Sequence, residues 1–197
     1  MSLLLDGTTQ DLLFRAARTA NTFTTDPVTD GQLKAVYDLI KYGPTEMNGQ
    51  PLRIVLVRSP EARERLLEHM DDGNKTKTSA APLVAIMAAD TNFHHELHRT
   101  FPHAPTARDK FDRHEALRVG SARLNAALQV GYFIVGVRAA GLAAGPMVGF
   151  DADGINQTFF PDGEHQVLAV VNVGKPGANA WFGRGPRLDY DDVVTTA

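Results

Sequence analysis

Arginine side chains near both ends of the chain could together bind a phosphate group. Arg18, Thr19 and Asn21 lie close to the N-terminus, and Arg184 and Arg187 lie close to the C-terminus. Arginine can form two parallel hydrogen bonds to phosphate oxygens, and hydroxyl and amide groups can complete the binding shell. Each of these side chains alone is most often a solvated surface group. Their joint occurrence favours a phosphate-bearing ligand.

Two further segments could place backbone and amide groups against a flat heteroaromatic ring. Residues 44–51 place small and amide side chains between two prolines, directly after an expected helix. Residues 145–149 contain two glycines, which let backbone N–H groups approach a ligand closely. Asn74 and Lys77 are three residues apart, on one side of an expected turn. The alternatives are an ordinary helix-to-strand connection and an ordinary glycine-rich turn.

The histidines raise the alternative of a metal site. His94, His95 and His98 fall within five consecutive residues, and His94 and His98 could share one helix face with Glu96 nearby. The spacing differs from the His-Glu-x-x-His pattern of metalloproteases. His103 lies in a proline-flanked loop. A structural or exposed role is therefore favoured, and no metal is expected.

Composition excludes several kinds of chemistry. The chain has no cysteine, which removes disulfides, cysteine-bound zinc, iron–sulfur clusters and thiol nucleophiles. Redox chemistry would then need a bound organic cofactor or a metal held by histidines and carboxylates. The net charge of −3 argues against a general nucleic-acid binder. Dinucleotide-binding, P-loop and nucleophile-elbow motifs have no support in the sequence.

The length of 197 residues favours one domain, 1–197. Leu3–Leu5 is too short for the apolar core of a signal peptide, and Asp6 follows at once. The longest apolar stretch, residues 130–137, is far below the roughly 20 residues of a membrane span. We therefore expect a cytoplasmic protein without membrane contact.

Helical and strand patterns alternate along the chain. We expect helices ending near Arg18, capped by Asp30 and by Ser59, over residues 115–140, and capped by Asp151. We expect strands over residues 52–57, 83–88 and 166–173, and short helical turns within residues 90–114. The pattern predicts an α/β or α+β sandwich with one central sheet. The helix over residues 115–140 is apolar on nearly all sides, which is typical of the centre of a fold or of a subunit interface.

These segments together resemble the FMN-dependent nitroreductase family, from Leu12 to Val194. Within that family, the chain resembles the branch of the malonic semialdehyde reductases of pyrimidine utilisation. The matching motifs are Arg18-Thr19-Ala20-Asn21, Gly43-Pro44-Thr45 with Asn48 and Pro51, Gly73-Asn74 with Lys77, Ala81-Pro82, Phe101-Pro102-His103, Gly141-Leu142, Gly145-Pro146-Met147, Gly149-Phe150-Asp151, and Pro186-Arg187-Leu188.

The resemblance implies an α+β three-layer sandwich, with a central, mainly antiparallel sheet flanked by helices. It implies a homodimer with two FMN sites at the subunit interface, and ping-pong hydride transfer from NADH or NADPH. The second substrate would be a small aldehyde such as malonic semialdehyde, reduced to 3-hydroxypropanoate. Two alternatives remain open: a broad-specificity nitro or quinone reductase, and a flavin-storage protein without physiological hydride transfer.

The resemblance also assigns roles to individual residues. The phosphate and ribityl end of FMN would be held by Arg18, Thr19, Asn21, Arg184 and Arg187. The pyrimidine side of the ring would be faced by Asn74 and Lys77, and its N5 side by Met147, Val148 and Gly149. The partner subunit would contribute Pro44, Thr45, Met47 and Asn48. Many family members carry a basic residue in place of Asn21 and an acid in place of Val148, so backbone groups would bind the cofactor near N5. A proton could come from Lys77, His103 or water.

Overall fold

A four-stranded antiparallel sheet lies at the centre of the residues that the structure describes. The computed structural model describes residues 3–197, so residues 1 and 2 of the expected domain lie outside it. The strands are β1 (Leu52–Val57), β2 (Leu83–Asp90), β3 (Ala143–Met147) and β4 (His165–Gly174). Their order is β1-β2-β4-β3, and every neighbouring pair is antiparallel. The expected central antiparallel sheet is confirmed.

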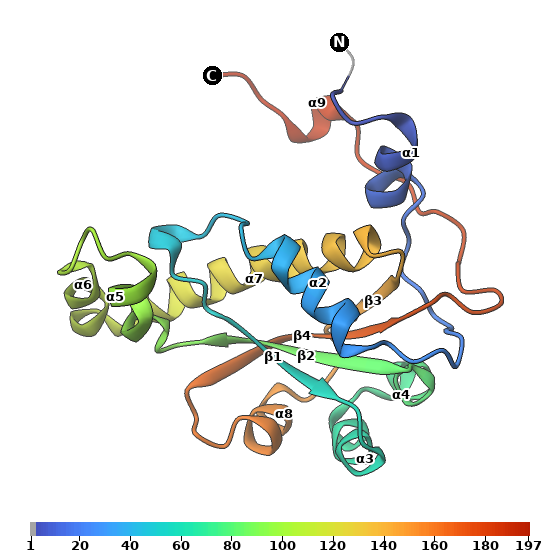
Figure 1. Cartoon of the computed structure of the whole chain (residues 1–197), viewed down its shortest axis with the longest axis horizontal. Helices are drawn as coiled ribbons and strands as arrows, with labels where there is room; N and C mark the ends of the chain where they lie inside the picture. The colour runs from blue at the N-terminus through green and yellow to red at the C-terminus, as the bar shows by residue number, and fades with distance from the viewer. Residues whose placement is uncertain (1–2) are drawn as a thin grey trace.

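Strand β2 is buried on both faces, which requires a helical layer on each side of the sheet. Leu83, Ala85 and Met87 point into one core, and Val84 and Ile86 point into the other. The first core contains residues of α2 (Asp30–Ile40) and α7 (Glu115–Ala139), and the second contains residues of α3 (Pro60–His69) and α8 (Ala152–Phe159). Figure 1 shows the resulting three layers, with α4 (Asp72–Ala80) beside α3.

The remaining elements are short. They are α1 (Gly7–Gln10), the π-helix η1 (Asp11–Arg15), the 3₁₀-helices η2 (Glu46–Asn48) and η3 (Phe93–Glu96), α5 (Leu97–Thr100), α6 (Ala107–Arg113) and α9 (Tyr190–Val193). The short helical turns expected within residues 90–114 are confirmed. In Figure 1, α1 and α9 lie close together and stand away from the three layers. None of the helices within residues 3–197 combines the length and the apolar character needed to cross a membrane.

Several local expectations were wrong. The first helical segment ends at Arg15 rather than near Arg18. The second helix is capped by Thr29 rather than Asp30, because Thr29 and Gln32 form a reciprocal capping box. Asn74 lies on helix α4 rather than on a turn. That helix lacks apolar periodicity and buries only Thr78, so its sequence gives little helical signal.

Gly136 sets the distance between α2 and α7. It is buried, and an added Cβ atom there would collide with Cγ2 of Ile40 and lie 3.2 Å from Cγ1 of Val36. Both neighbours belong to the core between α2, α7 and the sheet. The two helices can therefore approach this closely only where α7 has no side chain.

We predict that Gly136→Ala destabilises the protein by about 1–3 kcal/mol, because a closely packed core must move to admit the methyl group. The matched control is Gly120→Ala, also within α7. An added Cβ atom at Gly120 meets no described atom within 4 Å, so this variant should gain about 0.5–1 kcal/mol from helix propensity. Urea unfolding measures both changes. Equal stability of the two variants would contradict the close contact.

Candidate functional site

The first predicted segment, residues 18–21, lies between the edge strand β3 and the C-terminal arm, which we define as residues 175–189. The N–H of Ala20 donates to the carbonyl of Ala144 at 3.2 Å. The N–H of Asn21 donates to the carbonyl of Ala180 at 3.0 Å. These backbone bonds place Arg18 and its neighbours beside the first residues of β3.

Two of the predicted arginines are brought together by the C-terminal arm. Nη1 of Arg18 donates to the carbonyl of Phe182 at 3.1 Å, and Nη2 of Arg184 donates to the carbonyl of Ala17 at 3.1 Å. Each guanidinium therefore bonds to the backbone of the other's segment. Arg187 is exposed, and its Nη1 donates to the carbonyls of Gly185 and Pro186 within its own arm.

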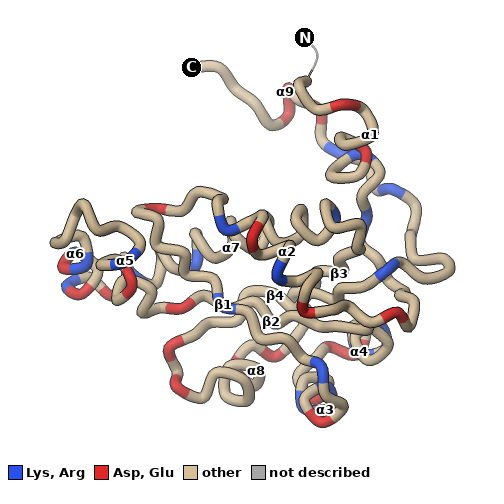
Figure 2. Tube along the Cα trace, viewed as in Figure 1, with Lys and Arg blue, Asp and Glu red and all other residues tan. Residues whose placement is uncertain are grey.

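A third arginine, Arg138 in the last turn of α7, lies near Arg18 and Arg184. Its Nη1 donates to the carbonyl of Leu13 at 3.3 Å. Burial lowers the pKa of Arg138, and the positive charge of Arg184 lowers it further. A cavity of about 210 Å³ is lined by Arg18, Arg138 and Trp181, among others. Figure 2 shows several basic positions on this side of the molecule. An anion in the cavity would relieve the repulsion between the arginines.

Sequence reasoning missed Arg138 because a basic residue in the last turn of a helix has an ordinary explanation. Such a residue interacts favourably with the negative end of the helix dipole. Only the tertiary structure shows that Arg138 and Arg184 are close enough for their charges to interact.

The third predicted segment, Met147 to Gly149, follows directly along β3. Met147 is buried, whereas Val148 is 78% exposed. The carbonyl of Gly149 accepts hydrogen bonds from Nδ2 of Asn74 at 2.9 Å and from the N–H of Asp71 at 3.1 Å. An added Cβ atom at Gly149 would lie 2.6 Å from Oδ2 of Asp71 and 2.7 Å from Nδ2 of Asn74. Glycine is therefore needed at this position for close packing against α4.

The start of helix α4 packs against the residues that follow β3. The amide N–H of Asn74 is bonded to the Gly149 carbonyl. Lys77 is half-buried and lies nearly one turn further along the helix. The buried hydroxyl of Thr78 lies 3.7 Å from the sulfur of Met147, with Asn172 of β4 next to it. Neither Thr78 nor Asn172 belongs to a motif that sequence reasoning could have singled out.

The loop over residues 44–51 has a strained backbone. Met47, Asn48 and Gln50 have φ angles of 49°, 50° and 47°, in the left-handed region. Asparagine tolerates that region, but methionine and glutamine rarely adopt it. Residues held in such conformations persist only where surrounding contacts impose them, and they occur often at functional sites. The loop is thus a rigid element rather than an ordinary connection.

Helix α7 supplies the contacts that hold this loop. The buried Oδ1 of Asn125 accepts from the N–H of Glu46 at 2.7 Å, and Oγ of Ser121 donates to the Glu46 carboxylate at 2.6 Å. The hydroxyl of Tyr132 donates to the carbonyl of Pro44 at 3.0 Å. Both Asn125 and Ser121 are polar groups buried within a helix, and both bond to Glu46 of the loop.

Within this loop the predicted residues differ in their contacts. Oγ1 of Thr45 accepts from the N–H of Gln50 at 3.2 Å, and Nδ2 of Asn48 donates to the carbonyl of Thr100 at 2.8 Å. Met47 packs against the core formed by η3, α5 and α6. Pro44 is exposed.

Within one chain, the loop and the arginine cavity lie at different places along α7. Asn125 contacts the loop and Arg138 lines the cavity, and 13 residues of helix separate them, or about 20 Å along the axis. In Figure 1 the loop lies towards the left end of α7, whereas β3 and the arm lie at its right end. The structure brings the other predicted segments to β3 but leaves residues 44–48 away from it.

The histidines do not form the pair that helical spacing suggested. The chain changes from the 3₁₀-helix η3 to α5 at Leu97, so His94 and His98 do not share one regular helix face. His98 donates from Nδ1 to the carbonyl of His95 at 2.8 Å, whereas Nε2 of His94 lies 2.9 Å from Oδ1 of Asp112. His103 stacks against Phe101, with ring centroids 4.0 Å apart.

Comparison with known proteins shows the family of this chain. The model of the nitroreductase family matches residues 15–175. A Streptomyces coelicolor protein with the provisional name NADH dehydrogenase/NAD(P)H nitroreductase is 64% identical over 196 residues, covering all of both chains.

Solved structures share the fold at low identity. A provisionally named nitroreductase from Exiguobacterium sibiricum, solved in complex with FMN, superimposes with a TM-score of 0.84 at 16% identity, covering 100% of this chain and 99% of the other. An enone reductase of gut-bacterial fatty acid saturation superimposes with a TM-score of 0.81 at 16% identity, covering 98% and 99%. The chain belongs to the nitroreductase family and has its fold.

Proposed function

We propose that this chain is a single-domain, FMN-dependent NAD(P)H oxidoreductase. The observation that carries the proposal is that three arginines from separate segments come together beside β3. Arg18 and Arg138 line one cavity, and Arg184 lies close enough for its charge to lower the pKa of Arg138. The relatives support it, since a 64% identical protein is named for NAD(P)H and a structural neighbour was solved with FMN. A bound FMN would supply the hydride chemistry, which no side chain of this chain can perform.

The residues at β3 fit an FMN molecule. Arg18 and Arg138 line the cavity and Arg184 lies near Arg138, and this concentrated positive charge suits a phosphate. Strand β3 leads from Ala143, which lines that cavity, to Gly149, which packs against the side chains of Asp71 and Asn74. In this proposal Arg18, Thr19, Asn21, Arg184 and Arg187 hold the phosphate and ribityl end. Asn74 and Lys77 face the pyrimidine edge, and Met147, Val148 and Gly149 face N5.

We propose that a second copy of the chain completes the site with Pro44, Thr45, Met47 and Asn48. Within one chain, those residues lie about 20 Å along α7 from the arginine cavity. Helix α7 leaves Leu124 and Leu128 63% and 45% exposed, and an apolar groove of about 700 Å³ runs along it. Exposed apolar surface of this extent is typical of subunit interfaces. A homodimer would cover the groove and place each rigid loop at the partner's cofactor.

The substrate proposed first is a small aldehyde such as malonic semialdehyde, reduced to 3-hydroxypropanoate. A cavity of about 330 Å³ lies beside Gly49 and Gln50 of the loop, and Lys41, Arg53 and Arg99 line it. Its size suits a small molecule. The three basic side chains are paired with Asp38, Asp90 and Glu96, so a substrate carboxylate would have to compete with these acids for them. Two alternatives are retained: a broad-specificity nitro or quinone reductase, and a flavin-storage protein.

We predict that Arg18→Ala weakens FMN binding by about 2–3 kcal/mol, because a charge-assisted hydrogen bond to phosphate is lost. Arg187→Ala should weaken binding in the same direction. Arg113→Ala is the matched control, since Arg113 is paired with Asp109 on α6 and neither residue lines the cavity. Fluorescence titration of the apoprotein with FMN measures all three dissociation constants. Unchanged affinity in both the Arg18 and the Arg187 variants would overturn the phosphate assignment.

We predict a homodimer whose interface exceeds the roughly 2,000 Å² typical of obligate pairs. Leu128→Asp should shift sedimentation towards the monomer and release flavin, because it places a charge in the apolar groove. Leu56→Asp, an exposed leucine on β1 outside that groove, should leave the dimer intact. A stable monomer of the unchanged protein that retains flavin at micromolar concentration would contradict the two-chain site.

We predict parallel-line kinetics for NAD(P)H and the aldehyde, because two substrates that react in turn at one site never form a ternary complex. Stopped-flow mixing of the reduced protein with malonic semialdehyde should restore the flavin absorbance at a rate consistent with turnover. Recovery with a quinone or nitroaromatic but not with the aldehyde would leave a reductase with a different substrate. Flavin absorbance that NADH and NADPH both leave unchanged would favour the storage protein.

A further inference from the structure

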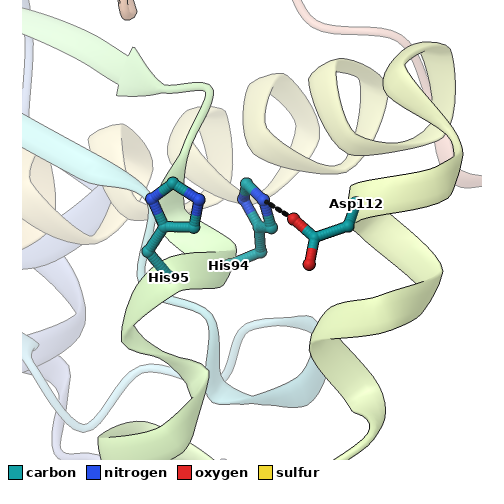
Figure 3. A group of neighbouring side chains, drawn as sticks. All are labelled: His94, His95 and Asp112. Carbon is teal, nitrogen blue, oxygen red and sulfur yellow. Dashed lines mark hydrogen bonds and ion pairs between the residues drawn. The ribbon is translucent and has the colours of Figure 1, made fainter.

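Three metal-ligating side chains gather away from the proposed flavin site. His94 and His95 lie on η3, and Asp112 lies on α6 (Figure 3). One ligand atom from each of the three lies within 4.8 Å of the others. These elements contact the start of α7, whereas the arginine cavity lies at its end. The cluster is therefore separate from the groups proposed to hold FMN.

The ring of His94 has one nitrogen bound and one nitrogen buried without a partner. Its Nε2 lies 2.9 Å from Oδ1 of Asp112. Because a carboxylate only accepts, Nε2 must carry the hydrogen, and Nδ1 then carries a lone pair. His94 is 1% exposed, and Nδ1 has no hydrogen-bond partner among residues 3–197. A buried polar atom without a partner is unfavourable, so this nitrogen calls for a ligand.

His95 lies on the side of His94 where that free nitrogen points. The two imidazole rings are 4.3 Å apart between centroids and tilted by 41°. In Figure 3 the unbonded nitrogen of His94 faces the ring of His95, and Asp112 lies on the opposite side. Nε of Arg108 donates to the second oxygen of Asp112 at 3.0 Å, which holds the carboxylate in place. A cation at Nδ1 of His94 would thus have the His95 imidazole beside it and, behind the His94 ring, an oriented carboxylate.

We propose that His94, His95 and Asp112 form a binding site for one divalent transition-metal cation of the zinc class. Imidazole nitrogens suit zinc, nickel and copper far better than magnesium or calcium. A carboxylate that accepts from the far nitrogen of a histidine fixes its tautomer and increases its basicity towards a metal. Nδ1 of His94 and a ring nitrogen of His95 are the protein ligands, Asp112 is the positioning residue, and water completes the coordination.

Binding an ion would require the ligand atoms of the cluster to move closer together. Zinc–nitrogen bonds of about 2.0–2.1 Å hold neighbouring ligand atoms closer together than the 4.8 Å limit here. His95 is exposed, so its side chain can rotate by the small amount required. The ion would stabilise η3 against the adjoining α6, and with it the segment whose Thr100 carbonyl holds Asn48 of the loop.

Equilibrium dialysis of the chelator-treated, full-length protein with Zn²⁺ tests the proposal. We expect one saturable Zn²⁺ per chain, not displaced by an equal concentration of Mg²⁺. His95→Gln and Asp112→Asn should each weaken binding at least about tenfold. His103→Gln is the matched control, because that histidine lies outside the cluster and should bind Zn²⁺ as the unchanged protein does.

Thermal unfolding provides a second readout that does not depend on enzyme activity. Zn²⁺ should raise the Tm of the unchanged protein and of His103→Gln, and should leave the Tm of His95→Gln unchanged. Absence of saturable binding to the unchanged protein would overturn the proposal. Binding that survives undiminished in both His95→Gln and Asp112→Asn would overturn it as well, since the ion would then lie elsewhere.

Discussion

The double-sided burial of strand β2 is the constraint on which the rest of the structure depends. Residues Leu83 to Ala89 are all fully buried, so successive side chains enter two different cores. A strand in this position must be covered by helices on both faces, because neither face can contact water. The pairing of β2 with β1 and β4 fixes the order of the sheet. It also leaves β3 at the edge beyond β4.

That edge position gives β3 its role in the proposed site. An edge strand has unpaired backbone groups on its outer side. In this protein the N-terminal segment bonds there at Ala144, and the C-terminal arm bonds to that segment in turn. Residues from the two ends of the chain therefore meet at one place, and their arginines meet there with the end of α7. The same strand then carries the chain to Gly149, where α4 packs against the backbone.

Helix α7 separates the two groups of residues that the proposed cofactor site needs. It binds the strained loop through Asn125 and Ser121 near its start and lines the arginine cavity through Arg138 at its end. A straight helix cannot bring those groups together. The same helix exposes an apolar groove, and burying that groove against a second copy is what would join them. In this proposal, helix α7 therefore links the formation of the homodimer to the binding of the cofactor.

The sequence by itself determined strands β1, β2 and β4 and the long helix, but not β3, whose small residues and proline lack a strand pattern. The apolar run Leu83–Ala88 is unambiguous, because burial on both faces leaves no polar interruption. The motifs also pointed to the family, because arginine, glycine and proline at these spacings are rare in combination. Helix α4 was missed, because a short polar helix held by tertiary contacts has no periodic signal.

Only the tertiary structure decided which of these residues meet. Arg138 joined the arginines because α7 ends beside the arm, a contact between residues far apart in sequence. His94 was paired with Asp112 rather than His98 because the chain changes helix type at Leu97, which no local spacing reveals. Sequence spacing determines which side chains share a local face. The packing of whole elements determines which distant faces come into contact, and functional sites are formed by those contacts.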